Sequence, residues 1–264
     1  GGNFIISGLQ TQASESNQGL FGYIQQGTIK NVVVINSNIL GDQNVGGIVG
    51  QIFRGSGDVT ISNCYFEGKV SGNYNVGGIV GQNYACTIEN CCNFGNITGG
   101  SRVGGILGYV NFNSSKITNC YNKGNVSGAN YVAGICGYLI SSDVKNCFNR
   151  GNINASGNCV AGIVASTANG YGPSGIYSSY NTGIVQGGGD NIGGIIGYAD
   201  KYAGISNAYT NVLCCFNIGA VKSLSSSASN IGGVIGQNNS GNPLHAAIWA
   251  NYWGGDCQTT YGIG

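Results

Sequence analysis

Apolar and polar positions alternate along short stretches that recur about every 28 residues. In "CYNKGNVSG" (120–128) the β-branched Val126 lies between polar residues, and Ile97 and Ile153 have the same surroundings. This is the period of a strand with one buried face. The helical spacing of apolar residues is absent, and the frequent glycines would be costly in helices. The pattern therefore predicts an all-β protein built from short strands.

A glycine-bounded apolar pair, such as "VGGIVGQ" at 45–51, marks each repeat. Its second glycine recurs at Gly19, Gly47, Gly78, Gly105, Gly134, Gly162, Gly194 and Gly233. Short strands with glycine corners at a fixed period predict a parallel β-solenoid (β-helix), in which each repeat stacks on the last. We expect about eight coils of about 28 residues. With ~4.8 Å between stacked strands, the rod would be roughly 40 Å long.

A second set of columns keeps step with the first. One column holds Cys64, Cys91, Cys120, Cys147, Ser179 and Cys215, and the next residue is aromatic in most copies: Tyr65, Tyr121, Phe148, Tyr180, Phe216 and Tyr252. An Ile or Val stands three residues before the cysteine, so the two cannot share a strand face. A left-handed bend between them would turn both inward, and asparagines occupy that place at Asn63, Asn90, Asn119 and Asn146. We expect these asparagines to bond from coil to coil.

The repeat region sets the domain boundaries. We predict an N-terminal lead-in strand or cap over 1–17, the solenoid repeats over 18–255 and a tail over 256–264. Wider spacings between the late copies predict surface insertions near 167–175, 199–211 and 222–229. Tyr171 and Tyr202 lie in the first two insertions and are candidate binding residues.

Charge excludes several classes of function. Charged residues form 7% of the chain and the net charge is +1, so the chain has no electrostatic footprint for nucleic acid or an anionic membrane surface. No apolar run approaches the ~20 residues of a membrane-spanning helix. The chain begins at Gly1 without a signal segment, and we expect it to be a piece of a longer protein.

The 11 cysteines leave three interpretations open. The favoured one is a reduced ladder in the core, because free Cys behaves as a small hydrophobe. Disulfides between adjacent coils also fit the strand spacing. Metal binding is the least favoured, because the cysteine pairs are adjacent and His245 is the one histidine. We predict no metal and no cofactor.

Catalytic groups are not grouped in the sequence. His245 falls in an expected surface loop, and the nine acidic residues fall in different columns. Asp42, Asp58, Asp143 and Asp190 have the surroundings of turn residues. Carbohydrate-cleaving β-helix enzymes need clustered carboxylates, so we predict that the chain is not an enzyme and keep that class as a minor alternative.

The two linked columns resemble the GLUG motif. "VGGIVGQ" followed by "ISNCYFEGKVSG", "VAGICGY" followed by "VKNCFNRGNI", and the first copy "GLFGYI" carry the resemblance, which covers roughly residues 18–255. It implies a large, repetitive, adhesin-like surface or secreted protein. The family has no catalytic residues to transfer to this chain.

Five N-x-S/T sequons lend some support to a secreted protein: Asn96, Asn113, Asn125, Asn154 and Asn238. Unpaired thiols favour a reducing compartment instead. Our first hypothesis is therefore a non-enzymatic structural or adhesive module of a cell-surface or extracellular protein, with a protein or carbohydrate ligand. The alternative is a filament or scaffold protein that stacks end to end with copies of itself, in an intracellular reduced compartment.

Overall fold

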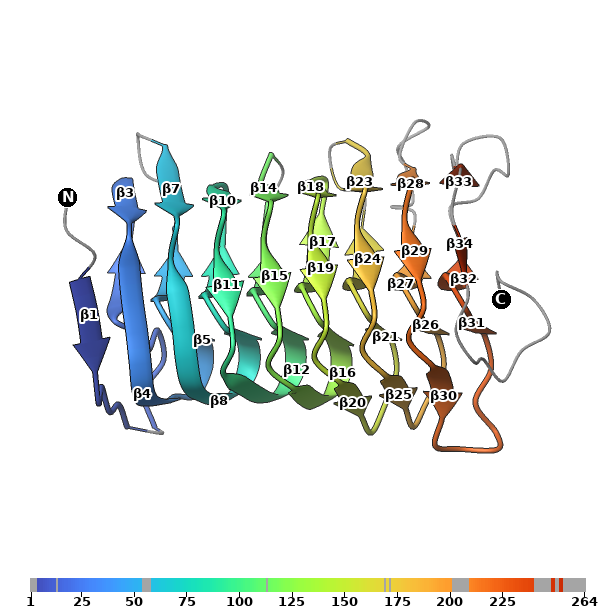
Figure 1. Cartoon of the computed structure of the whole chain (residues 1–264), viewed down its shortest axis with the longest axis horizontal. Helices are drawn as coiled ribbons and strands as arrows, with labels where there is room; N and C mark the ends of the chain where they lie inside the picture. Colours follow the sequence, from blue (N-terminus) through green and yellow to red (C-terminus); the bar gives the residue numbers. More distant parts are fainter. Residues whose placement is uncertain are drawn as a thin grey trace.

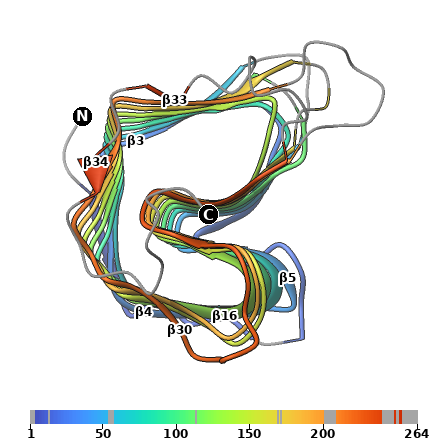
Figure 2. The same ribbon diagram turned by 90° about the vertical axis from the view of Figure 1, so that its right-hand side faces the viewer.

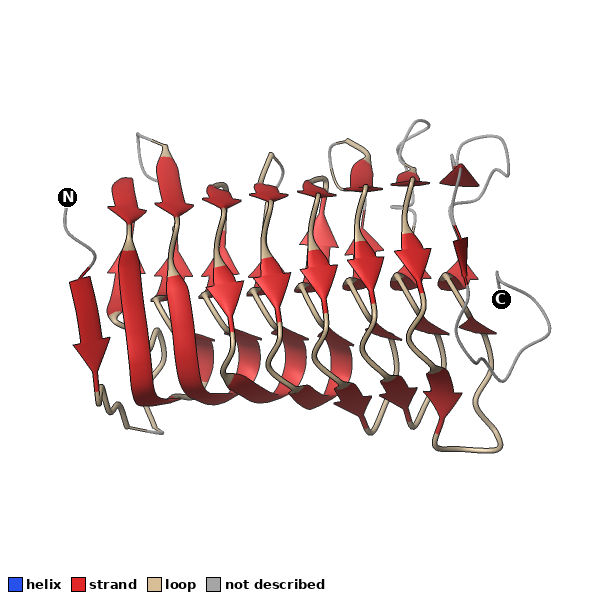
Figure 3. Ribbon diagram, in the orientation of Figure 1, coloured by secondary structure: helices blue, strands red, loops and turns tan. Residues whose placement is uncertain are grey.

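The chain winds into one long β-solenoid made of strands and connecting loops (Figures 1 and 3). The computed structural model describes residues 4–12, 14–53, 58–112, 114–168, 170, 172–200, 209–239, 248–249 and 252–253. Within these residues no helix occurs. The polypeptide runs from one end of the rod to the other, adding one coil per repeat (Figure 1).

Three parallel sheets run along the rod. Sheet A has 18 strands: β1 Phe4–Ser7, β4 Val32–Leu40, β5 Gln43–Gly46, β8 Tyr65–Gly77, β11 Cys92–Asn93, β12 Asn96–Gly104, β15 Tyr121–Asn122, β16 Val126–Ala133, β19 Phe148–Asn149, β20 Ile153–Ala155, β21 Val160–Ala161, β24 Tyr180–Asn181, β25 Val185–Gly187, β26 Ile192–Gly193, β29 Phe216–Asn217, β30 Val221–Ser223, β31 Ile231–Gly232 and β34 Tyr252–Trp253.

The other two sheets have eight strands each. Sheet B contains β2 Phe21–Ile24, β6 Val49–Ile52, β9 Val80–Asn83, β13 Leu107–Val110, β17 Cys136–Ile140, β22 Val164–Ala168, β27 Ile196–Ala199 and β32 Ile235–Asn238. Sheet C contains β3 Gly27–Lys30, β7 Val59–Ser62, β10 Thr87–Glu89, β14 Lys116–Thr118, β18 Asp143–Lys145, β23 Ser174–Tyr177, β28 Thr210–Leu213 and β33 Ile248–Trp249.

The register pairs each residue with its counterpart one repeat away. Ile88, for example, pairs with Ile61 on one side and Ile117 on the other. The predicted parallel β-solenoid is therefore confirmed, with a spacing of about 29 residues. About six turns are complete. This number differs slightly from the expected eight coils.

Each coil is drawn inward on one side (Figure 2). The inward fold lies between sheet A and sheet B, at the repeat marker, in which a third glycine such as Gly81 follows the glycine pair. There the two arms pack backbone to backbone: a Cβ at Gly81 would lie 2.5 Å from the Val45 nitrogen. Glycine is needed at this position because any side chain would separate the arms.

The asparagine corners form as predicted. Asn63, Asn90, Asn119 and Asn146 all have left-handed φ values between 53° and 54°. Their side chains also bond between coils: the Asn119 Nδ2 donates to the Asn90 Oδ1 at 3.2 Å, and the Asn146 Nδ2 donates to the Asn119 Oδ1 at 3.3 Å. Asparagine tolerates this backbone region better than most residues.

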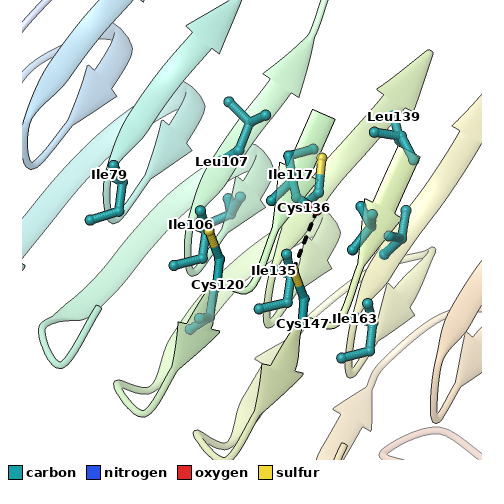
Figure 4. Close-up of a cluster of buried hydrophobic side chains, with 14 of the residues drawn as sticks. Ile79, Ile106, Leu107, Ile117, Cys120, Ile135, Cys136, Leu139, Cys147 and Ile163 are labelled. Atoms are coloured by element: carbon teal, nitrogen blue, oxygen red, sulfur yellow. Dashed lines mark hydrogen bonds between the residues drawn. The ribbon is translucent and has the colours of Figure 1, made fainter. Parts of the chain in front are cut away.

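The bend sends both flanking columns into one core. Ile88, Ile117 and Val144 precede the corners and are fully buried, as are Cys91 and Cys120 after them. Figure 4 shows Cys120, Cys136 and Cys147 among isoleucines of neighbouring coils, including Ile106, Ile117 and Ile135. Interlocking of identical side chains from coil to coil gives the core its regular packing.

One local expectation is wrong. Asp143 does not lie in a turn but begins β18, where it pairs with Lys116 and Gly175 on the outer face of sheet C. The insertion near 222–229 links β30 to β31, whereas those near 167–175 and 199–211 link sheet B to sheet C, between β22 and β23 and between β27 and β28.

Candidate functional site

The five cysteines of the predicted ladder lie in one buried column. Each thiol donates to the carbonyl oxygen two residues earlier; the Cys120 Sγ lies 3.2 Å from the Thr118 oxygen and the Cys147 Sγ 3.3 Å from the Lys145 oxygen. Ser179 takes the same place, and its hydroxyl donates to the Tyr177 oxygen at 2.8 Å. Cys64, Cys91 and Cys215 follow the same pattern. The column selects a small donor that reaches the preceding carbonyl.

The buried thiols, in this ladder and elsewhere in the core, are poor nucleophiles. Burial raises the pKa of Cys120 well above its usual range, and burial also raises the pKa of Cys86 and of Cys136 to about 12. All ten cysteines among the described residues are free thiols. A buried thiol held in its neutral form contributes packing and a weak hydrogen bond, not chemistry.

The aromatic column stacks along the outside of sheet A. The rings of Tyr121 and Phe148 are 4.8 Å apart and 2° from parallel, and Phe148–Tyr180 and Tyr180–Phe216 stack alike at 5.0 and 4.8 Å. Cys92 replaces the aromatic in one coil, and there Phe94 fills the gap, 5.0 Å from Tyr65.

Stacking covers the faces of these rings, because each inner ring has a neighbouring ring on both sides, and the faces are therefore closed to a ligand. Lys123 and Arg150 cover further aromatic surface through cation–π contacts with Phe94 and Phe148. A sugar binds an aromatic ring by its face, so this column favours structure over ligand binding. Tyr252 continues the column in the backbone register, opposite Phe216.

A buried asparagine ladder, which the sequence analysis missed, runs two residues after the cysteines. We call Asn93, Asn122, Asn149, Asn181 and Asn217 the core asparagine ladder; all are fully buried. Each Nδ2 donates to the next Oδ1 at 2.7 to 2.8 Å: Asn93 to Asn122, Asn122 to Asn149, Asn149 to Asn181 and Asn181 to Asn217. Each also donates to the glycine carbonyl two residues later, for example Gly151.

The ladder explains the glycine of the repeat marker. A Cβ on Gly78 would lie 2.6 Å from the Asn93 Cγ, and Gly105, Gly134 and Gly162 stand in the same relation to the asparagines of their own coils. The signal for the ladder was present in the sequence, as an asparagine two residues after the corner position in five successive copies, from Asn93 to Asn217, with Phe66 in that place after Cys64. It was not recognised because asparagine is normally a surface residue.

A hollow of about 540 Å³ on the outer face of sheet C is the best candidate for ligand binding. Strands β14, β18, β23 and β28 form its floor, and its lining includes Lys116, Asp143, Lys145 and Tyr177. At Gly175 the absence of a side chain lets the Tyr177 ring lie across the sheet, in contact with that glycine. The Asn211 Nδ2 donates to the Tyr177 hydroxyl at 3.4 Å and holds the ring in place.

The electrostatics of this hollow are mixed. Burial raises the pKa of the Asp143 carboxyl, while the nearby Lys116 and Lys145 ammonium groups oppose the rise. Burial also raises the pKa of Tyr177, and the Asp143 charge adds to that effect. The hollow thus offers one carboxylate, two ammonium groups and a phenol, which is a set of donors and acceptors for polar hydroxyl-bearing ligands.

A second hollow, of about 580 Å³, lies on sheet A beside the irregular pairing of β4 with β8. Its lining is mainly amide and backbone groups, with Glu67, Lys69 and Phe94. Phe94 already contacts Tyr65 and Tyr121, so this hollow lacks the open ring of the sheet C hollow.

The other predicted residues are spread over the surface. Asn96, Asn125 and Asn154 are exposed and Asn238 is half-buried. Asn96 and Asn125 bond through their Oδ1 atoms to the backbone of the next coil, at Asn125 and Asn152. Asn113, Tyr171, Tyr202 and His245 lie outside the described residues.

The columns that build this solenoid match a known motif. The family model described as the GLUG motif matches residues 72–98 and 99–127. Residues 72–127 therefore carry two GLUG repeats. Each matched GLUG repeat spans one coil and includes one glycine-pair turn and one cysteine corner, and the same register continues through the coils on either side.

Comparison with solved structures supports the fold of the GLUG repeats. A crystal structure from Bacteroides ovatus, described as a "putative immunoglobulin A1 protease", is 18% identical, with a TM-score of 0.54 over 96% of this chain and 67% of the other. At this identity the likeness shows a shared fold alone. No curated protein sequence matches the chain.

Two absences among the described residues bear on the partner classes. No helix long and apolar enough to cross a membrane is found there. No group of three or more His, Cys, Asp or Glu side chains in that part of the chain could hold a metal ion.

Proposed function

We propose that this segment is a non-enzymatic, adhesive β-solenoid module of a larger cell-surface or extracellular protein, and that it binds carbohydrate in the sheet C hollow. The observation that carries the proposal is Tyr177, whose ring lies across Gly175 between two lysines and an aspartate. An aromatic ring laid on a sheet, with hydrogen-bonding groups around it, suits stacking against a sugar ring.

Catalysis finds less support in this hollow. Glycoside hydrolysis needs two carboxyl groups across the scissile bond, roughly 5 to 9.5 Å apart. The described lining of the hollow contributes Asp143 as its carboxylate, with Lys116 and Lys145 beside it. This arrangement supports binding without cleavage.

Glycan binding tests the proposal. The segment would be applied to a glycan array, and ligands found there would be measured by titration against Tyr177→Ala, with Tyr74→Ala as the matched control because Tyr74 is an exposed tyrosine on sheet A. We expect at least a tenfold loss of affinity in Tyr177→Ala and no loss in the control. Equal binding by the two variants would refute the assignment, and shortened oligosaccharide products would refute the non-enzymatic proposal.

The exposed sequons Asn96, Asn125 and Asn154 support an extracellular location, whereas ten free cysteines support a reducing compartment. Intact-mass spectra of the natural protein, with thiol alkylation before and after reduction, decide between them. Hexose mass would support the cell-surface proposal. A bare mass with every thiol alkylated before reduction would place the protein inside the cell.

End-to-end assembly is a second candidate function. The first coil exposes Ile5, Phe21 and Tyr23, all apolar or aromatic, beside strand edges that could pair with a further coil. Sedimentation as a function of concentration tests this. Growing rods would support assembly by copies of the chain, and a constant monomer mass at high concentration would exclude it.

A further inference from the structure

A second site lies at the inward fold, where one column of residues changes its chemistry. The residue just before the glycine-pair marker has a left-handed φ, between 55° and 64°, in every coil. We call this position the seam column; it holds Asn17, Asn44, Asn75, Arg102, Tyr131, Cys159, Asn191 and Asn230. Asparagine suits that backbone, whereas Arg102, Tyr131 and Cys159 do not.

The asparagines of the seam column bond along the rod. The Asn44 Nδ2 donates to the Asn17 Oδ1 and the Asn75 Nδ2 to the Asn44 Oδ1, both at 2.8 Å, and Asn230 donates to Asn191 at 2.9 Å. Between Asn75 and Asn191 these amide–amide bonds are missing, and the Asn191 Nδ2 donates instead to the Cys159 Sγ at 3.8 Å. Three successive coils therefore have non-asparagine residues in left-handed backbone, and strain of this kind collects at functional sites.

The residues that face the seam column across the inward fold change together with it. At the two flanks the seam is closed by amide pairs: Asn75 donates to Gln82 at 3.0 Å and Asn230 to Gln237 at 3.3 Å. In the middle, the Arg102 Cζ lies 4.3 Å from the ring centre of Tyr109 and 5.6 Å from that of Tyr138. The Tyr131 ring meets Tyr138 edge to face at 5.3 Å.

This half-buried cluster contains unused hydrogen-bonding groups. Within the described part of the chain, the Arg102 guanidinium has these ring contacts but no carboxylate partner. The Tyr131 and Tyr138 hydroxyls likewise have no hydrogen-bond partner among the described residues. A guanidinium held flat by aromatic rings presents its N–H fork to a planar anion.

An orphaned acceptor beside the cluster is a second, independent observation. The Asn75 Oδ1 is buried and has no partner among the described residues, although Asn75 itself is only 6% exposed. Its Nδ2 bonds back to Asn44, so the Oδ1 faces the coil in which Arg102 replaces the next asparagine. A buried acceptor without a donor is costly unless something supplies one.

We propose that Arg102, Tyr131 and Tyr138, which lie beside the buried Asn75, form a binding site for a carboxylated sugar residue. Its carboxylate would accept from the Arg102 guanidinium, and its ring hydroxyls would bond to the Tyr131 and Tyr138 hydroxyls. Such a sugar carries both kinds of group on one ring. Asp200 acts electrostatically on Tyr131 and Tyr138. The anion therefore belongs at the Arg102 end, away from that charge.

Restoring the column tests the site. We would measure binding of 3′-sialyllactose and a glucuronic-acid disaccharide by titration calorimetry, with lactose as the neutral probe. Arg102→Asn should weaken acidic-sugar binding at least tenfold and raise the melting temperature, because the new Asn Nδ2 can bond to the Asn75 Oδ1. Arg102→Lys keeps the charge without the fork and should lose most of the affinity.

The matched control is Arg150→Asn, which removes the same charge from the outer aromatic column and should bind like the parent protein. Tyr177→Ala should also bind acidic sugars unchanged, so a failure of the sheet C proposal is distinguishable from a failure here. The proposal is overturned if neither acidic probe binds, if lactose or an acidic peptide binds equally well, or if Arg102→Asn binds like the parent.

Discussion

Two asparagine columns run along this solenoid, and they differ in one respect. The core asparagine ladder is unbroken from Asn93 to Asn217, fully buried, and satisfied at each step by the next coil. The seam column begins and ends in the same way but is interrupted at Arg102, Tyr131 and Cys159. Stacking of the coils by itself favours an unbroken column of asparagines. The interruption of the seam column costs amide hydrogen bonds and therefore requires another explanation.

The same contrast holds for aromatic side chains. The rings of Tyr121, Phe148 and Tyr180 stack face to face on one another, whereas the Tyr177 ring lies across a glycine. Repetition therefore indicates structure in this protein, and departures from repetition indicate the surfaces available to ligands. Four predictions test that contrast.

The largest expected effect is the pH dependence of the repetitive core. Buried thiols such as Cys86, Cys120 and Cys136 have raised pKa values in the fold, while an unfolded thiol titrates near 8.5. Above that pH the unfolded chain releases protons that the folded chain keeps. Stability is therefore full below about pH 8.5 and falls above it, by roughly 1.4 kcal/mol per thiol and pH unit.

Melting curves from pH 7 to 10.5, followed by circular dichroism, measure this fall. Cys120→Ser is the control: Ser179 shows that a hydroxyl fits the column, and the variant should lose stability less steeply by one thiol's share. A melting temperature that stays level to pH 10.5 would contradict the buried, neutral thiols.

Breaking the core asparagine ladder should have the next largest effect. Asn149→Ala removes three side-chain bonds, from Asn122, to Asn181 and to the Gly151 carbonyl, and leaves a cavity against Gly134. We expect a loss of about 3 kcal/mol in the free energy of unfolding. Urea denaturation followed by hydrogen exchange would show the loss centred on the neighbouring coils. Asn154→Ala, on the exposed face of the next strand, should change stability by less than about 0.5 kcal/mol.

The aromatic column should contribute less, because it lies outside the core. Phe148→Ala removes two stacked contacts, with Tyr121 and Tyr180, and should cost about 2 kcal/mol. Thermal melts would be compared with Leu224→Ala, which truncates an exposed apolar side chain in a loop. Equal melting temperatures for these two variants would mean that the rings lie in register without stabilising the fold.

The smallest expected effect has the opposite sign. Cys159→Asn puts asparagine back into the seam column, relieves the left-handed backbone and replaces the weak 3.8 Å bond from the Asn191 Nδ2 to the Cys159 Sγ by an amide–amide bond, so stability should rise by about 1 kcal/mol. The reverse change, Asn230→Cys, should lower the melting temperature by a similar amount. A fall in Cys159→Asn would show that the interruption serves packing, and the contrast between the two columns would lose its meaning.

Much of the fold could be predicted because it repeats. The glycine pair and the cysteine corner recur at one spacing, and the asparagine before each cysteine has the left-handed geometry that its tolerance predicts. Asp143 was misplaced because a single acidic residue beside two serines resembles a turn, and only its pairing with Lys116 shows that it begins a strand. Tyr177 gave no signal, because nothing in its local sequence says that Gly175 will leave its ring in the open.

The sequence by itself determined the stacking: identical residues one repeat apart must lie in register, because only then do their side chains and backbone groups satisfy one another. What it left undecided was which polar residues face inward. The core asparagines are buried because the chain folds inward at the glycine pair and brings Gly134 against Asn149. That same fold sets Arg102 over Tyr109 and Tyr138. Such contacts depend on how the coil closes, a property of the whole turn that no local pattern contains.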